Sequence, residues 1–179
     1  MRRFCTVRNI LFGGVLAVLL ASMQVVIVGQ SKESSSLSGL EFRQAPDFEL
    51  TDINGEGVHL SDFQGRVVML QFWAQWCTSC EGDLRVFQEI HGNNLDREVT
   101  ILGLGYASGS RGEISQLAKS LGVTFPMLLC TEEVRSDYQV AVFPTTFVID
   151  RQGRIRDRRV GTLESGYWKK RVADLLSDN

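Results

Sequence analysis

The stretch FWAQWCTSC at residues 72–80 places two cysteines, Cys77 and Cys80, two residues apart. It overlaps the end of Val67–Trp73, a run that is nearly all apolar, as expected for a strand buried on both faces of a sheet. Apolar residues then recur every third position from 84 to 90, which indicates a helix. We therefore expect the cysteines to lie between a buried strand and a helix, with Cys77 near the helix N-terminus.

That position suits thiol chemistry. Unpaired backbone N–H groups and the positive end of the helix dipole stabilise a thiolate, which lowers the pKa of Cys77 from its free value of about 8.5. Cys77 is then the attacking nucleophile. Cys80, one turn further along, can attack the sulfur of Cys77 and release a bound substrate. The pattern predicts a dithiol/disulfide redox centre.

A zinc site is the main alternative, because Cys-x-x-Cys pairs also bind metals. A structural zinc needs four ligands, supplied by a second cysteine pair or by histidines at metal spacing. The other candidates, Cys130, His59 and His91, occur singly along the chain. We therefore predict neither a metal nor another cofactor.

The redox segment resembles the active site of thioredoxins, and further segments resemble the TlpA/ResA-like (CcmG/DsbE-like) branch of membrane-anchored thiol-disulfide oxidoreductases. Those segments are Ala45–Leu50 with the following Asn-Gly pair, Leu60–Gly65, and Phe143–Asp150. The resemblance covers about residues 42 to 176. It implies an α/β, thioredoxin-like three-layer fold with a mixed central sheet, an N-terminal hairpin and a central insertion.

The resemblance also implies a substrate-binding wall beside the cysteines. Its members would be Trp76, Phe143 and Pro144, with a cis Phe143–Pro144 bond, which X-Pro bonds adopt at low cost. Two alternatives stay open: Pro144 as an ordinary trans-proline at a strand start, and Phe143 as a simple apolar cover. Between the cysteines, Thr78 and Ser79 are predicted to tune the reduction potential through their hydroxyls, or else to serve as helix caps.

An acidic residue is also expected to take part. Thioredoxin proper has a buried acid at the position of Gln71, whereas Asp83 aligns with an acid of the ResA-like branch. Asp83 is three residues after Cys80, hence on the same helix face, and could accept its proton. The alternative is a water-facing acid favoured by the helix dipole, as we expect for Glu81.

The first 30 residues differ from the rest. Three arginines precede the apolar run Ile10–Val28, and no acid occurs before Glu33. We expect residues 1–30 to be a membrane anchor or a cleaved signal sequence, with the basic end in the cytoplasm. Serine-rich residues 31–41 read as a flexible spacer, and residues 42–179 as the thioredoxin-like domain. The resemblance places that domain on the periplasmic side of a bacterial inner membrane.

Charge argues against a nucleic-acid partner. Residues 31–179 hold 16 basic and 21 acidic residues, a formal charge of −5. A local cluster of arginines surrounds a probable hairpin; its members are Arg151, Arg154, Arg156, Arg158 and Arg159. We interpret the cluster as a solvated edge strand, and a docking patch for lipid headgroups or an acidic partner is the alternative.

The remaining pattern alternates strands and helices and ends on a hairpin, which favours a mixed sheet covered by helices. Strands are expected at 67–73, 99–105, 126–130, 145–149 and 154–160, after an entry hairpin near 47–60. Helical segments are expected at 79–92, 112–121, 132–139 and 165–177. Cys130 is predicted to be a small buried hydrophobe, with a regulatory thiol as the alternative.

Three functional classes follow. The first is an extracytoplasmic thiol-disulfide oxidoreductase; the resemblance implies a reductase for apocytochrome c or a copper-site protein, supplied with electrons by a membrane thiol reductase. The same chemistry run backwards would introduce disulfides. The second is a thiol peroxidase, although Ala74 stands where peroxiredoxins carry threonine or serine. The third is a non-catalytic copper chaperone, which would need a histidine beyond His91.

Overall fold

The structure is a computed structural model that describes residues 43–93, 98–162 and 164–177. The strands are β1 (Glu49–Thr51), β2 (Gly57–His59), β3 (Val67–Trp73), β4 (Val99–Tyr106), β5 (Met127–Cys130), β6 (Thr145–Ile149) and β7 (Ile155–Val160). The helices are η1 (Leu60–Phe63), α2 (Thr78–Gly92), α3 (Arg111–Leu121), α4 (Glu132–Asp137) and α5 (Ser165–Ser177). The strands of the main sheet and the four α-helices lie within one or two residues of their predicted positions; the entry hairpin is shorter than expected, and the short helix η1 was not predicted.

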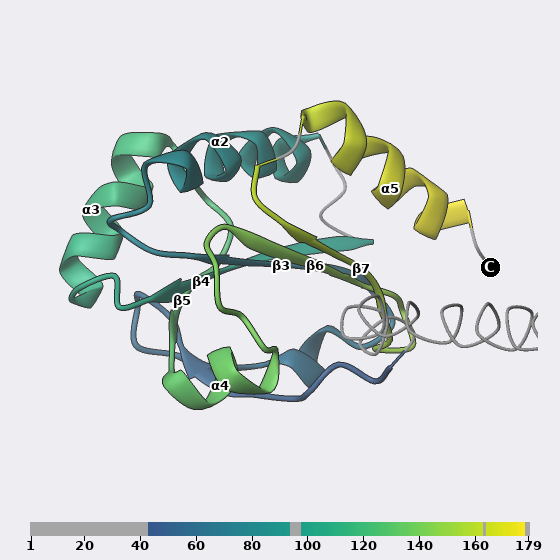
Figure 1. Ribbon diagram of the computed structural model, residues 1–179, viewed down its shortest axis with the longest axis horizontal. Coiled ribbons are helices and arrows are strands. Elements are labelled where there is room, and N and C mark those ends of the chain that lie inside the picture. Colours follow the sequence, from purple (N-terminus) through teal and green to yellow (C-terminus); the bar gives the residue numbers. More distant parts are fainter. Residues whose placement is uncertain (1–42, 94–97, 163, 178–179) are drawn as a thin grey trace, which may run out of the picture. The chain divides into compact units, whose positions relative to one another are not determined.

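Strands β3 to β7 form one mixed sheet in the order β5-β4-β3-β6-β7. The central strand β3 is parallel to β4 and antiparallel to β6, and all seven of its residues are buried. Helices α2 and α5 cover one face of the sheet, and α4 lies against the other with the β1–β2 hairpin, as Figure 1 shows. This three-layer arrangement confirms the predicted thioredoxin-like fold.

Two apolar cores result from the alternation of side chains along β3. Val67, Met69 and Trp73 face the helices α2, α3 and α5, whereas Val68 and Leu70 face the hairpin and α4. The carboxyl end of β3 leads directly to the cysteines, so the redox pair sits at the edge of the sheet where both cores end.

The arginine cluster lies along an edge strand, as the sequence predicted, and the side chains of Arg154 and Arg159 are 48% and 46% exposed. Three of its arginines also pair with buried carboxylates. Arg154 and Arg156 lie 3.0 and 3.3 Å from Asp150, and Arg159 lies 3.1 Å from Asp157 (N–O distances). A buried charge is costly unless it is paired, so these arginines stabilise the fold as well as the solvated edge. The carboxylates that pair with these arginines lie in the β6–β7 hairpin itself. The net charge of the segment does not show which residues pair.

Helix α5 is tied to β7 through Asp157. The Tyr167 hydroxyl donates a hydrogen bond to this carboxylate, and Arg171 pairs with it at 3.4 Å. The Arg159 guanidinium also lies 5.2 Å above the Tyr167 ring. The tyrosine, carboxylate and arginine thus form a unit that fastens the C-terminal helix.

No helix among the described ranges is long and apolar enough to span a membrane. The predicted anchor or signal sequence at 1–30 and the spacer at 31–41 lie outside the described residues, so both stay predictions.

Gly105 allows β4 to pass under the indole of Trp73, its neighbour in the sheet register. A Cβ atom at position 105 would lie 2.9 Å from the buried Trp73 ring and 3.3 Å from Ser108 Cβ. We expect Gly105→Ala to lower the free energy of unfolding by about 1–3 kcal/mol through overpacking, as measured by urea denaturation. The control is Gly166→Ala in α5, where a Cβ meets nothing within 4 Å and where alanine should gain up to about 1 kcal/mol. Equal effects at both positions would contradict the proposed clash.

Candidate active site

Cys77 and Cys80 form a disulfide, with 5.4 Å between their Cα atoms. Cys77 is the N-cap residue of α2, and Cys80 lies in the first turn, where its N–H donates to the Cys77 carbonyl at 3.0 Å. Cys77 is 8% exposed and Cys80 is fully buried. A substrate thiolate or disulfide can therefore reach only the sulfur of Cys77, which matches the predicted roles of attacking and resolving cysteine.

The helix start around Cys77 supplies the predicted electrostatic setting. The backbone N–H groups of the first turn of α2 point towards the sulfur end of the site, and the dipole adds positive potential there. Of the two hydroxyls between the cysteines, Ser79 Oγ lies 3.5 Å from Cys77 Sγ. Neither Thr78 nor Ser79 occupies the N-cap position, which excludes the alternative that they serve as N-caps. Their role in tuning the reduction potential stays a prediction.

Trp76 and Phe143 form the predicted wall next to the cysteines. Trp76 is 67% exposed, and its ring meets that of Phe143 edge to face at a centroid distance of 5.6 Å. The Phe143–Pro144 bond is cis, as predicted. The loop that carries it is held by a hydrogen bond from Thr145 Oγ1 to the Val142 carbonyl at 2.6 Å, and Val142 itself is 54% exposed. The structure thus brings an exposed apolar surface to the reachable cysteine.

Tyr106 stands behind this wall, although the sequence analysis did not identify it. Its ring stacks on Phe143 with a centroid distance of 5.8 Å and an interplanar angle of 13°. The sequence did contain one indication that Tyr106 lies near the cysteines. Tyr106 ends a strand parallel to β3, and the carboxyl ends of parallel strands share one edge of the sheet.

Asp83 is buried on the helix face that covers the sheet, and it is 1% exposed. This position excludes the water-facing alternative, whereas Glu81 is exposed as expected. Burial raises the pKa of Asp83 from 3.8 to about 6, and the Thr162 hydroxyl offsets that rise in part. Neither carboxylate oxygen has a hydrogen-bond partner at normal distance among the described residues. Such a carboxyl can hold or release a proton near neutral pH.

Gln71 is fully buried in β3, and neither polar atom of its amide has a hydrogen-bond partner within the described ranges. The amide does not titrate, so it cannot act as a proton acceptor. Asp83 is therefore the titratable carboxyl that the structure buries behind the redox pair.

Cys130 is only partly buried, so the predicted small buried hydrophobe is confirmed in its packing against the core but not in complete burial. It ends the edge strand β5 opposite Tyr106 and packs against the second core. Desolvation raises the pKa of its thiol to about 12. Since the thiolate is the reactive form, Cys130 is an inert thiol near neutral pH.

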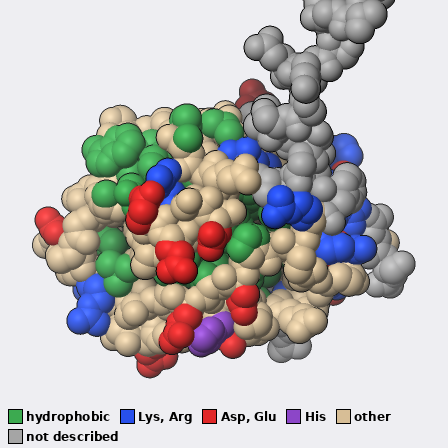
Figure 2. Space-filling model, turned by 60° about the horizontal axis from the view of Figure 1, so that its bottom comes forward, with side chains coloured by type: hydrophobic (Ala, Val, Ile, Leu, Met, Phe, Trp, Pro, Cys, Tyr) green, Lys and Arg blue, Asp and Glu red, His purple; other side chains and the backbone are tan. Residues whose placement is uncertain are grey.

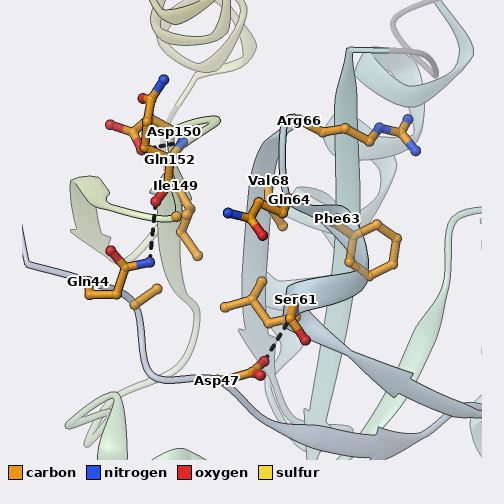
Figure 3. A pocket seen from close by; sticks show the side chains of 13 residues that line it. Gln44, Asp47, Ser61, Phe63, Gln64, Arg66, Val68, Ile149, Asp150 and Gln152 are labelled. Atoms are coloured by element: carbon orange, nitrogen blue, oxygen red, sulfur yellow. Dashed lines mark hydrogen bonds between the residues drawn. The ribbon is translucent and has the colours of Figure 1, made fainter.

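A cavity of about 330 Å³ lies at the opposite end of the sheet, away from the cysteines (Figure 3). Its floor is formed by Val68 and Ile149, which are neighbours in the β3–β6 register. Polar groups at its rim are engaged within the protein, since Ser61 N donates to Asp47 and Gln44 donates to the Gln152 carbonyl. The described residues contain no group of three or more His, Cys, Asp or Glu side chains arranged to hold a metal ion.

Comparison with known proteins agrees with this geometry. A family model described as the AhpC/TSA family matches residues 43–158. The thiol-disulfide oxidoreductase ResA of Bacillus subtilis is 33% identical over 154 residues, which cover 84% of this chain and 83% of ResA. The thioredoxin-like protein YneN of the same organism is 30% identical over 152 residues, which cover 84% of this chain and 89% of YneN.

Solved structures support the fold. A thiol:disulfide interchange protein of the thioredoxin family from Chlorobium tepidum superimposes with a TM-score of 0.69 at 21% identity, covering 75% of this chain and 96% of that one. StoA from Bacillus subtilis gives a TM-score of 0.61 at 22% identity, covering 70% of this chain and 96% of StoA.

A Cys-x-x-Cys disulfide at the start of the helix that follows the central strand of such a sheet defines a thioredoxin-fold thiol-disulfide oxidoreductase. The chain belongs to the AhpC/TSA family, as a thioredoxin-like member related to the TlpA/ResA-like oxidoreductases. These matches confirm the family relationship that the sequence resemblance predicted.

Proposed function

We propose that this protein is an extracytoplasmic reductase that exchanges its Cys77–Cys80 dithiol with a disulfide in a protein substrate. The single observation that supports this best is the pairing of a reachable Cys77 with an exposed aromatic wall, because such a wall suits a polypeptide better than a small molecule. We further propose apocytochrome c or a copper-site protein as the substrate and a membrane thiol reductase as the electron donor.

The proposed cycle balances two electrons. The Cys77 thiolate attacks one sulfur of the substrate disulfide; that S–S bond breaks, and the other substrate sulfur leaves as a thiolate. Cys80 then loses its proton to Asp83 and attacks Cys77 Sγ, which releases the second substrate sulfur. The substrate disulfide is reduced to a dithiol, and the Cys77–Cys80 pair is oxidised to the disulfide that the structure contains. The membrane reductase returns the pair to the dithiol.

The proposal is tested by the equilibrium reduction potential of Cys77–Cys80 in the full chain, titrated in thiol redox buffers with alkylation and a mass readout. A reductase requires a potential well below about −220 mV, in the direction of thioredoxin at about −270 mV. A potential near about −120 mV, as in DsbA, would instead make the protein an oxidant that introduces disulfides.

A further inference from the structure

A second layer of contacts stands behind the substrate wall. The Tyr106 ring stacks on Phe143, and Phe143 in turn contacts Trp76 edge to face. Phe143 is therefore held between two aromatic rings, that of the half-buried Tyr106 and that of the exposed Trp76 next to Cys77. Figure 2 shows hydrophobic side chains gathered at the upper left of one face, with separate acidic side chains in its middle and lower part.

Helix α4 holds the far side of Tyr106. The Tyr106 hydroxyl donates a hydrogen bond to Glu132 Oε2 at 2.6 Å, and Arg135 Nε donates to the same oxygen at 2.8 Å. The Arg135 guanidinium also lies 5.2 Å from the centre of the Tyr106 ring and donates to the Val140 carbonyl. These hydrogen bonds lower the pKa of Glu132 to about 2, so the unit stays charged at neutral pH. We call Tyr106, Glu132 and Arg135 the bracing unit.

We propose that Tyr106 is a positioning residue that sets specificity for protein disulfides, because the bracing unit holds Phe143 where it can meet apolar side chains of a docked polypeptide. Rigid aromatic groups with few rotatable bonds supply contact area at low entropic cost, and fixing them in advance strengthens binding. We expect a small disulfide to depend on Phe143 far less than a docked polypeptide does. The inference rests on the proposed exchange with protein substrates.

The chain offers a matched control in Tyr167. Its hydroxyl also donates to a carboxylate, that of Asp157, and an arginine lies 5.2 Å over its ring, as over Tyr106. The ring of Tyr167 contacts Trp168 in α5 and not Phe143. The two tyrosines therefore share their local chemistry and differ in whether they support the wall.

The test compares Tyr106→Leu, Tyr106→Phe and Tyr167→Leu in the full chain, with dithiothreitol as reductant. Insulin is the protein disulfide and 2-hydroxyethyl disulfide is the small one. We expect Tyr106→Leu to raise KM for insulin about fivefold, the size of one aromatic pair, while kcat for insulin and the rate with 2-hydroxyethyl disulfide change less than about twofold. Tyr106→Phe keeps the ring stack and should fall between wild type and Tyr106→Leu. Tyr167→Leu should leave KM for insulin unchanged.

A second measurement does not depend on turnover. Trp73 and Trp168 are 1% exposed, so acrylamide quenching of tryptophan fluorescence reports mainly on Trp76. We expect Tyr106→Leu to increase the quenching constant of the reduced protein, because Phe143 loses its backing, and Tyr167→Leu to leave it unchanged. If Tyr167→Leu is too unstable to purify, Tyr167→Phe replaces it and is compared with Tyr106→Phe.

Equal losses on insulin and 2-hydroxyethyl disulfide in Tyr106→Leu, or an unchanged KM together with unchanged quenching, would overturn the inference while leaving the proposed function intact. A wild-type chain that reduces 2-hydroxyethyl disulfide but not insulin would overturn both.

Discussion

We expect Cys80→Ser to convert the enzyme into a trap that accumulates a mixed disulfide through Cys77, with steady-state turnover reduced on the order of a thousandfold. Cys77, at the helix N-terminus, is the more accessible of the two sulfurs and can still attack a substrate disulfide. The buried Cys80 is the thiol that follows it within the same turn, so its loss removes the release step. Cys77→Ser should abolish both turnover and trapping, because the buried Cys80 cannot reach a protein substrate.

The measurement is non-reducing electrophoresis with mass spectrometry of the trapped species, beside insulin reduction rates. Cys130→Ser is the control, since the raised pKa of this thiol makes it unreactive, and it should retain wild-type turnover. A trapped adduct on Cys80 in the Cys77→Ser variant would reverse the assigned roles of the two cysteines. An adduct on Cys130 would show that this thiol takes part after all.

The second large effect is expected from Asp83→Asn, which should move stability and activity in opposite directions. The folded protein holds the Asp83 proton more tightly than the unfolded chain, because burial raises the pKa from 3.8 to about 6. The native state then binds more protons than the unfolded state between these two values. Its free energy of unfolding therefore falls as the pH rises from about 4 to about 6, by up to about 3 kcal/mol, and is level above that window.

Asparagine cannot ionise, so the free energy of unfolding of the variant does not fall in this way as the pH rises. At pH 8 we expect Asp83→Asn to be more stable than the wild type by about 1–2 kcal/mol, since a buried amide without partners still carries some cost. Below about pH 4 the advantage should vanish. The measurement is urea denaturation of the oxidised protein at both pH values, and Glu81→Gln, an exposed acid of the same helix, is the control with no comparable change.

Activity should respond in the opposite sense. If Asp83 accepts the proton of Cys80, kcat of the wild type should rise through about pH 6, and Asp83→Asn should remove that rise and lower kcat for insulin about a hundredfold. A variant that gains stability at pH 8 and keeps the wild-type pH profile would show that Asp83 is buried without acting on Cys80.

Much of this protein can be predicted from local patterns. The apolar run of β3, the helical spacing after it and the Cys-x-x-Cys pair each lie within a few consecutive residues, and they led to the correct fold and redox pair. Element bounds followed because glycines, prolines and periodicity act at short range. The unequal exposure of Cys77 and Cys80 also agrees with their order on one helical turn.

The exceptions depend on which contacts the packing allows. Asp157 is paired with Arg171 from α5 as well as with its near neighbour Arg159, and Cys130 is left half-buried at a sheet edge rather than enclosed. Charge and hydrophobicity give each residue's tendency but not its partner, because the partner is chosen by how the elements pack.

The same reason explains the substrate wall. Trp76, Tyr106 and Phe143 belong to three segments that are far apart in the chain, and their rings meet because β3 and β4 end, and the antiparallel β6 begins, at one edge of the sheet. The type of chemistry is thus encoded in nine consecutive residues, 72–80, since strand, helix start and cysteine spacing are local properties. The surface that selects a substrate arises from packing, since no local pattern brings Tyr106 to Phe143.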